Sequence, residues 1–271
     1  MGEPIFSAAG AFFAPSEQAR GPWDPRALHG GAPAALIASE FERHEPVPGA
    51  QIARLGFELL RPIPFAPLRV LTRTLRPGRR VQELAAELFA DLGGGDEQLV
   101  CRASALRVQA IPEQLPELPA GALAGERMPG PDEAEPISFA LDPENDQPSF
   151  AATAMEMRWL DDPWRPGPGR VWQRLRYPLV DDEPASPLAR VAASADFGNG
   201  ISASLPFDGW LFINADLHVH LHRQPRGEWI GLDARTLLHA GGTGLAETVL
   251  HDLDGPVGRG FQTLVVAPRE Q

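Results

Sequence analysis

The sequence predicts an α+β protein built from two copies of one unit, each with one helix followed by antiparallel strands. The first observation is internal similarity, because residues 55–62 (LGFELLRP) align with residues 217–224 (LHVHLHRQ) at an offset of 162 residues. The second observation is the order of the predicted elements along the chain, because an Ala-rich helical segment precedes a run of strand-like stretches in each half. This period is too long for a solenoid repeat and indicates a duplicated domain.

The two copies differ at positions that carry chemistry. Arg54 in the first copy corresponds to Asp216 in the second, and, after a one-residue slip, Cys101 corresponds to Gln262. A duplicated unit needs its apolar core in both copies but its reactive groups in only one. We therefore expect one working site, with its polar residues in the second copy.

Composition limits the class of protein. The chain has 271 residues, 43% of them hydrophobic, which is enough for one large core or two domains. The formal net charge of −12 argues against a nucleic-acid binder, and no apolar stretch is long enough to span a membrane. The single cysteine, Cys101, excludes an internal disulfide, and no signal peptide is evident. We expect a cytoplasmic protein.

The first unit is expected over residues 1–110. His29-Gly30-Gly31-Ala32-Pro33 opens a helix that runs to about Arg43, since the glycines allow a tight entry and proline suits a first turn. Four strand-like stretches follow, at residues 52–60, 68–75, 82–90 and 98–108.

Residues 111–147 are rich in Pro, Glu, Gly and Ala and are expected to be a linker, so that the second unit covers residues 148–271. In that unit, Ser186-Pro187-Leu188 opens a second Ala-rich helix that reaches Asp196-Phe197-Gly198-Asn199-Gly200. Asp254-Gly255 predicts a hairpin between the last two strands. The strands are expected at residues 154–160, 170–177, 212–223, 228–235, 244–251 and 259–267.

Four segments make the pattern more specific. They are residues 29–36 (HGGAPAAL), 195–200 (ADFGNG), 212–216 (FINAD) and 258–262 (GRGFQ). With these segments the chain resembles the thioesterase-like double-hotdog family, which includes acyl-CoA thioesterase II. The resemblance implies two tandem hotdog units, each with a long central helix wrapped by a curved antiparallel sheet. It also implies hydrolysis of acyl-CoA thioesters without a cofactor.

The resemblance further implies an Asp, a Gln and a Ser or Thr that hold and activate water. Asp216 and Gln262 match the first two, and Thr236 is the nearest hydroxyl, although Thr74 stands at the equivalent place in the first copy. A carboxylate can accept the proton of an attacking water while an amide fixes its second hydrogen bond. Thr236 is equally explained as a strand residue. Backbone N–H groups at Gly30 and Gly31 are candidates for binding the thioester oxygen.

Other patterns leave alternatives open. Asp216, His218, His220 and His222 share one face of a regular strand, which is compatible with a metal site but is better explained by a polar sheet face or subunit interface. A non-catalytic acyl-CoA or lipid-binding protein is the first rival function. An enoyl-CoA hydratase, which pairs an Asp with a His, is the second. We expect a homo-oligomer, because hotdog sheets commonly pair through exposed faces or edges.

Overall fold

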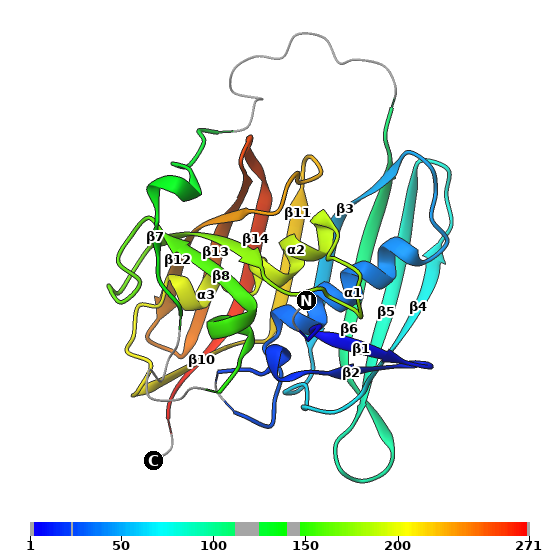
Figure 1. Cartoon of the computed structure of the whole chain (residues 1–271), viewed down its shortest axis with the longest axis horizontal. Coiled ribbons are helices and arrows are strands. Elements are labelled where there is room, and N and C mark those ends of the chain that lie inside the picture. Colours follow the sequence, from blue (N-terminus) through cyan, green and yellow to red (C-terminus); the bar gives the residue numbers. More distant parts are fainter. Residues whose placement is uncertain (1–2, 23, 112–124, 140–146, 270–271) are drawn as a thin grey trace.

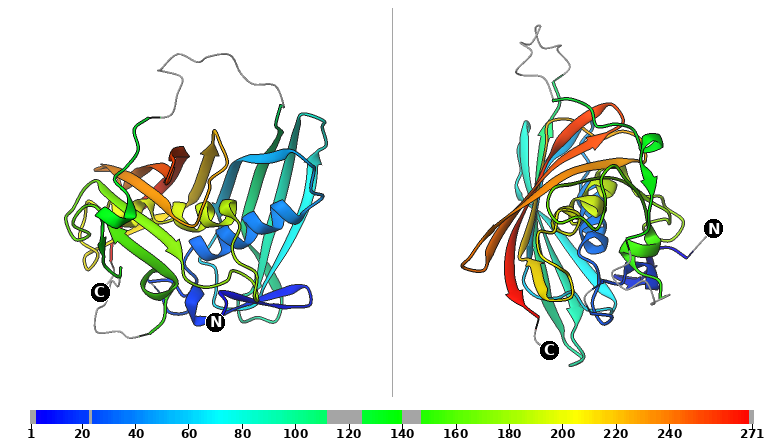
Figure 2. Two further views of the ribbon diagram at one scale, coloured as in Figure 1. Left: turned by 45° about the horizontal axis from the view of Figure 1, so that its top comes forward. Right: turned by 90° about the vertical axis from the view of Figure 1, so that its left-hand side faces the viewer.

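A computed structural model shows one curved antiparallel sheet with the helices packed against its inner, concave face (Figures 1 and 2). The structure describes residues 3–22, 24–111, 125–139 and 147–269. Of the predicted linker, residues 112–124 and 140–146 lie outside the described residues.

The first half follows the predicted order of one helix and then four strands. An N-terminal hairpin and a short 3-10 helix come before them. The elements are β1 (Phe6–Ala9), β2 (Phe12–Pro15), η1 (Glu17–Ala19), α1 (Gly31–Arg43), β3 (Ala50–Leu59), β4 (Leu68–Arg76), β5 (Val81–Asp91) and β6 (Glu97–Gln109).

The second half repeats this order with additional edge strands. A part of the predicted linker joins the sheet, because β7 pairs with β8. The elements are η3 (Pro131–Glu133), β7 (Glu135–Pro136), η4 (Phe150–Ala154), β8 (Met155–Trp159), β9 (Gly169–Leu175), α2 (Pro187–Ala195), α3 (Gly198–Ile201), β10 (Trp210–Asn214), β11 (Asp216–Leu221), β12 (Ile230–His239), β13 (Thr243–Asp252) and β14 (Gly255–Pro268).

The two repeated segments pair with each other at the centre of the sheet. The strand order is β1-β2-β4-β5-β6-β3-β11-β14-β13-β12-β9-β8-β7, so β3 and β11 join the halves. Gly56 lies opposite His218, and Leu55 and Phe57 lie opposite Val219 and Leu217. Because Gly56 and His218 are equivalent positions of the repeat, a local two-fold axis passes between them. The sequence repeat is thus a symmetry of the fold.

The predicted strand at residues 212–223 is interrupted. Asn214 pairs with Leu264 in β10, but His218 pairs with Phe261 in β11, so the register against β14 shifts by one residue around Ala215. A one-residue bulge exchanges the two faces of a strand. Phe212 therefore points inward from β10, while Leu217 and Val219 point inward from β11.

The helices differ in length between the halves. Helix α1 has 13 residues, and its C-terminal carbonyls are held by buried Arg107, which donates to the carbonyl oxygens of Phe41, His44 and Glu45. In the second half the expected long helix is instead a 9-residue α2 and a 4-residue α3. The break places Asp196 between them, against the N-terminus of α1.

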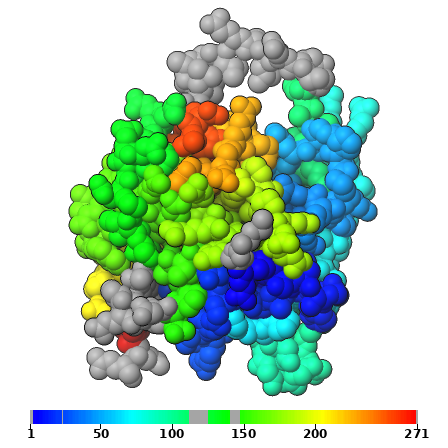
Figure 3. All heavy atoms as spheres, in the orientation of Figure 1, coloured from blue at the N-terminus to red at the C-terminus, as the bar shows by residue number. Residues whose placement is uncertain are grey.

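The halves also meet through the N-terminus. The N–H groups of Ile5 and Phe6 donate to the carbonyl oxygens of Pro178 and Leu179 at 3.0 and 2.9 Å. In the space-filling view the N-terminal hairpin (dark blue) lies beside the α2 region (yellow-green) (Figure 3). No helix in the described part of the chain is long and apolar enough to cross a membrane.

Candidate active site

A buried carboxylate lies where the two halves meet. Asp196, 7% exposed, follows α2 and packs against Gly30 at the start of α1. A Cβ atom on Gly30 would lie 2.8 Å from Asp196 Oδ2, so only glycine allows this close approach. Asn214 Nδ2 donates to Asp196 Oδ1 at 3.0 Å. A buried carboxylate needs hydrogen-bond donors such as this one. The second carboxylate oxygen, Oδ2, faces the first half of the chain.

His29 is the second partner of this carboxylate. Its Nδ1 lies 3.1 Å from Asp196 Oδ2, and both side chains are nearly buried. The imidazole stacks on Phe197 at a centroid distance of 4.3 Å, which fixes its plane. Nδ1 also lies 3.1 Å from the N–H of Gly31. Nδ1 can accept the hydrogen bond from Gly31 only when Nδ1 carries no proton, and it can donate to Asp196 only when it carries one. The contacts of His29 therefore allow two alternative hydrogen-bond arrangements.

Gln262 holds the turn that carries Asp196. Its side chain points inward from β14 and is 1% exposed. Nε2 donates to the carbonyl oxygen of Asp196 at 3.0 Å, and Oε1 accepts from the N–H of Asn199 at 2.9 Å. The amide therefore bridges the two residues on either side of the α2–α3 break and fixes the direction of the Asp196 side chain.

A small cavity begins at Asp196 and Gly30. Its volume is about 10 Å³, which is enough for about one water molecule. The remaining lining is apolar apart from the Cys101 thiol, and it lies between α1 and strands β3 and β11. Burial, and to a smaller extent the charge of Glu58, raises the pKa of Cys101 to about 12, so the thiol is neutral. The apolar lining includes Pro33, Ala34, Ile37, Phe57, Ile63 and Leu217.

The structure does not bring Asp216 and Gln262 together. Asp216 points to the outer face of the sheet, where it accepts hydrogen bonds from the Thr263 N–H at 2.6 Å and the Thr263 hydroxyl at 3.1 Å. Gln262 precedes Thr263 in the same strand and therefore points to the opposite face. Asp216 and the nearby His218 form part of an outer polar face, as their shared parity predicts.

The other predicted residues lie on the inner side. Thr236 Oγ1 is 2.8 Å from the hydroxyl of Ser202, beside α3, and within the described residues no hydrogen bond joins it to Asp196 or Gln262. Gly30 and Gly31 lie at the N-terminus of α1, next to the carboxylate. No partner is found for the Gly30 N–H within the described residues.

Three residues of this site were not predicted as functional, namely His29, Asp196 and Asn214. Each stands in a segment that carries the family resemblance. A signal was present for Asp196, because it is an isolated acid directly after an Ala-rich helix. Asn214 gave no such signal, since a continuous strand would have placed it on the face of Asp216. No group of three metal-binding side chains is found among the described residues.

Comparisons with known proteins agree with this fold. A model of the acyl-CoA thioesterase N-terminal domain matches residues 19–108, and a model of the acyl-CoA thioesterase C-terminal domain matches residues 131–266. No curated protein sequence matches the chain significantly.

Three solved structures show the same architecture. A candidate thioesterase II from Thermobifida fusca YX is 16% identical with a TM-score of 0.72, and the match covers 96% of this chain and 94% of that one. A conserved protein of unknown function with a hotdog fold from Alicyclobacillus acidocaldarius is 17% identical with a TM-score of 0.70, covering 98% and 96%. A candidate thioesterase from Novosphingobium aromaticivorans DSM 12444 is 20% identical with a TM-score of 0.69, covering 97% and 99%.

At these identities the solved structures establish the hotdog fold. The two domain models together cover both halves of the chain in the order expected for tandem units. The chain therefore belongs to the acyl-CoA thioesterase family.

Proposed function

We propose that this protein hydrolyses acyl-CoA thioesters and that Asp196 is the residue that activates water. The observation that supports this most directly is the buried Asp196 carboxylate at a water-sized cavity beside the N-terminus of α1. The sequence-based assignment of the carboxylate to Asp216 is replaced in this proposal, because Asp216 faces away from Gln262.

In the proposed reaction, water oxygen attacks the thioester carbonyl carbon and one water proton passes to Asp196. The carbon–sulfur bond then breaks and Asp196 returns the proton to the leaving thiolate, which gives a free acid and a thiol. Asn214 and His29 hold the two carboxylate oxygens in place. Gln262 is a positioning residue, because it acts on the backbone around Asp196.

The N-terminus of α1 supplies the electrophilic side of the site. The Gly30 N–H is available, and the helix dipole adds partial positive charge where the carbonyl oxygen becomes negative. The acyl chain would lie along the apolar side chains between α1 and β3. Since the cavity holds only about 10 Å³, the side chains that line it must move to admit the acyl chain.

The test compares two aspartates on opposite faces of the sheet. Asp196→Asn should lower thiol release from acyl-CoA by about 10²–10⁴-fold, because the amide cannot accept the proton. Asp216→Asn is the matched control and should retain activity close to that of the unmodified protein. Circular dichroism and thermal unfolding of both variants check that they fold. Activity lost in Asp216→Asn and kept in Asp196→Asn would refute the assignment.

One observation favours a second candidate, hydration of an enoyl-CoA. The 3.1 Å contact of His29 with Asp196 is an acid–base pair of the kind that hotdog hydratases use. The two reactions differ in their products. Loss of the enoyl absorbance with no free thiol would favour hydration, whereas release of free thiol favours hydrolysis.

A further inference from the structure

The space beside Asp196 limits the size of the acyl group that the proposed reaction can accept. The cavity that begins at Asp196 and Gly30 holds about 10 Å³, which is roughly the room that one water molecule needs. Ile37 is the last residue of α1 that lines it, and Phe57 is the largest side chain in its lining; each is 1% exposed. One turn beyond Ile37, Phe41 is fully buried. The cavity therefore extends along α1 for about two helical turns at most.

Hydrogen bonds at both ends of α1 hold the helix at this distance from the sheet. At its C-terminal end, the guanidinium group of buried Arg107 in β6 donates to the carbonyl oxygens of Phe41 and His44 at 2.8 and 2.7 Å. Just before its N-terminal end, the Leu28 N–H donates to the carbonyl oxygen of Ile63 at 2.8 Å. Lifting α1 away from the sheet would break these bonds and leave buried polar groups without partners, which is costly.

Small residues allow α1 to lie close to its neighbours. Ala34 lines the cavity, and Ala38 lies on the same face of α1 because it follows four residues later. Ala103 points inward from β6 beneath this helix. A Cβ atom on Gly31 would overlap the carbonyl oxygen of Ala193 in α2, so α2 fixes α1 from another side. The cavity can therefore grow by rotation of its side chains but not by movement of the helix.

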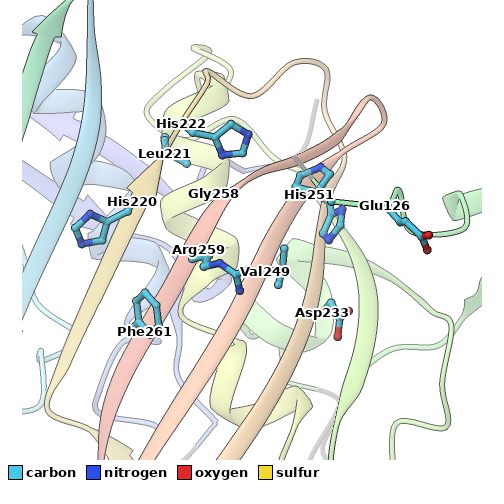
Figure 4. A pocket seen from close by; sticks show the side chains of 12 residues that line it. Glu126, His220, Leu221, His222, Asp233, Val249, His251, Gly258, Arg259 and Phe261 are labelled. Carbon is cyan, nitrogen blue, oxygen red and sulfur yellow. The ribbon is translucent and has the colours of Figure 1, made fainter. Parts of the chain in front are cut away.

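A larger pocket nearby does not provide an alternative place for the acyl group. It has a volume of about 660 Å³ and lies over β11–β14 on the outer face of the sheet (Figure 4). The sheet separates it from Asp196, and its lining includes the charged side chains of Glu126, Asp233 and Arg259. An apolar chain gains free energy by leaving water for an apolar surface, and this lining offers little of that.

We propose that this protein acts on short acyl-CoA thioesters, with acyl groups of about two to four carbons, and that Ile37 and Phe57 set this limit. The inference rests on the proposed hydrolysis at Asp196. A short acyl group needs only small rotations of the lining side chains. An octanoyl group would have to displace packed side chains beyond Ile37, while α1 remains held at both ends.

The experiment measures thiol release from acetyl-CoA, butyryl-CoA and octanoyl-CoA. For the unmodified protein, kcat/KM for butyryl-CoA should be at least about tenfold higher than for octanoyl-CoA, because even one methylene group in an apolar pocket changes kcat/KM by about tenfold or more. Ile37→Ala should raise the ratio of octanoyl-CoA to butyryl-CoA turnover at least about tenfold. Ile37→Val, which removes a single methyl group, should change this ratio in the same direction and serves if Ile37→Ala does not fold.

Leu36→Ala is the matched control. It removes as many carbon atoms as Ile37→Ala from a fully buried side chain of α1 that does not line the cavity. The ratio of octanoyl-CoA to butyryl-CoA turnover should therefore stay as in the unmodified protein. Circular dichroism of each variant checks that it folds.

Binding gives a second measurement that does not depend on hydrolysis. In calorimetric titrations of Asp196→Asn, butyryl-CoA should bind at least about tenfold more tightly than octanoyl-CoA. Turnover of octanoyl-CoA as fast as butyryl-CoA, an unchanged ratio in a folded Ile37 variant, or equal binding of the two thioesters would overturn the proposal. If no thioester releases thiol, the proposed hydrolysis is refuted, and the binding ratio alone decides whether the cavity selects short acyl groups.

Discussion

Replacing Gln262 with methionine tests whether this residue holds the catalytic turn. Methionine keeps most of the side-chain volume but removes both hydrogen bonds, at 3.0 Å to the Asp196 carbonyl and 2.9 Å from the Asn199 N–H. The site is 1% exposed, so water does not readily replace the amide. Leaving one buried backbone group without its hydrogen-bond partner costs about 1–3 kcal/mol. Loss of the partner for both the Asp196 carbonyl and the Asn199 N–H should therefore lower the free energy of unfolding by about 2–6 kcal/mol.

This loss is measurable by thermal unfolding. For a domain of this size each kcal/mol lowers Tm by about 2–4 °C, so Gln262→Met should lower Tm by at least about 4 °C. Gln109→Met is the matched control, because Gln109 donates one exposed hydrogen bond to the Pro48 carbonyl and its loss should change stability by less than about 0.5 kcal/mol. A Tm within about 1 °C of the unmodified protein would refute the reasoning. Thiol release should fall as well, since Asp196 loses its fixed direction.

Two further predictions concern titrating groups outside this turn. The Cys101 thiol is 1% exposed and burial raises its pKa to about 12, so a thiol reagent at pH 8 should label it only after urea unfolds the chain; rapid labelling of the native protein would contradict this. Burial by itself would raise the pKa of Asp252, but hydrogen bonds from Arg223 and from two backbone N–H groups outweigh it and hold the pKa below its usual value. The stabilisation is therefore present above about pH 4 and is lost as the pH falls through the folded-state pKa. Urea titrations at pH 7 and pH 3 measure the free energy of unfolding of Arg223→Gln and of the unmodified protein. Arg223→Gln should be the less stable of the two at pH 7, and it should lose less stability between pH 7 and pH 3. An equal loss of stability in both proteins on acidification would contradict the linkage.

The secondary structure was largely predictable from local pattern. Apolar alternation and turn residues placed β4, β5 and β6 to within one residue at each end. The structure adds what the duplication did not predict, namely that equivalent residues of β3 and β11 pair with each other around Gly56 and His218. The helix of the second half was less predictable, because its break after Ala195 depends on contacts made by Gln262.

What the sequence by itself determined is the α+β repeat, the inward face of β11 and the pair of glycines at the start of α1. What only the tertiary structure decided is which carboxylate lies against these glycines. The one-residue shift at Ala215 turns Asn214 inward while Asp216 points outward, and no local pattern signals it. Asp196 and His29 are 167 positions apart and meet because α1 and α2 pack against each other. Strand alternation is a local property, whereas a bulge and a helix contact depend on partners distant in the chain.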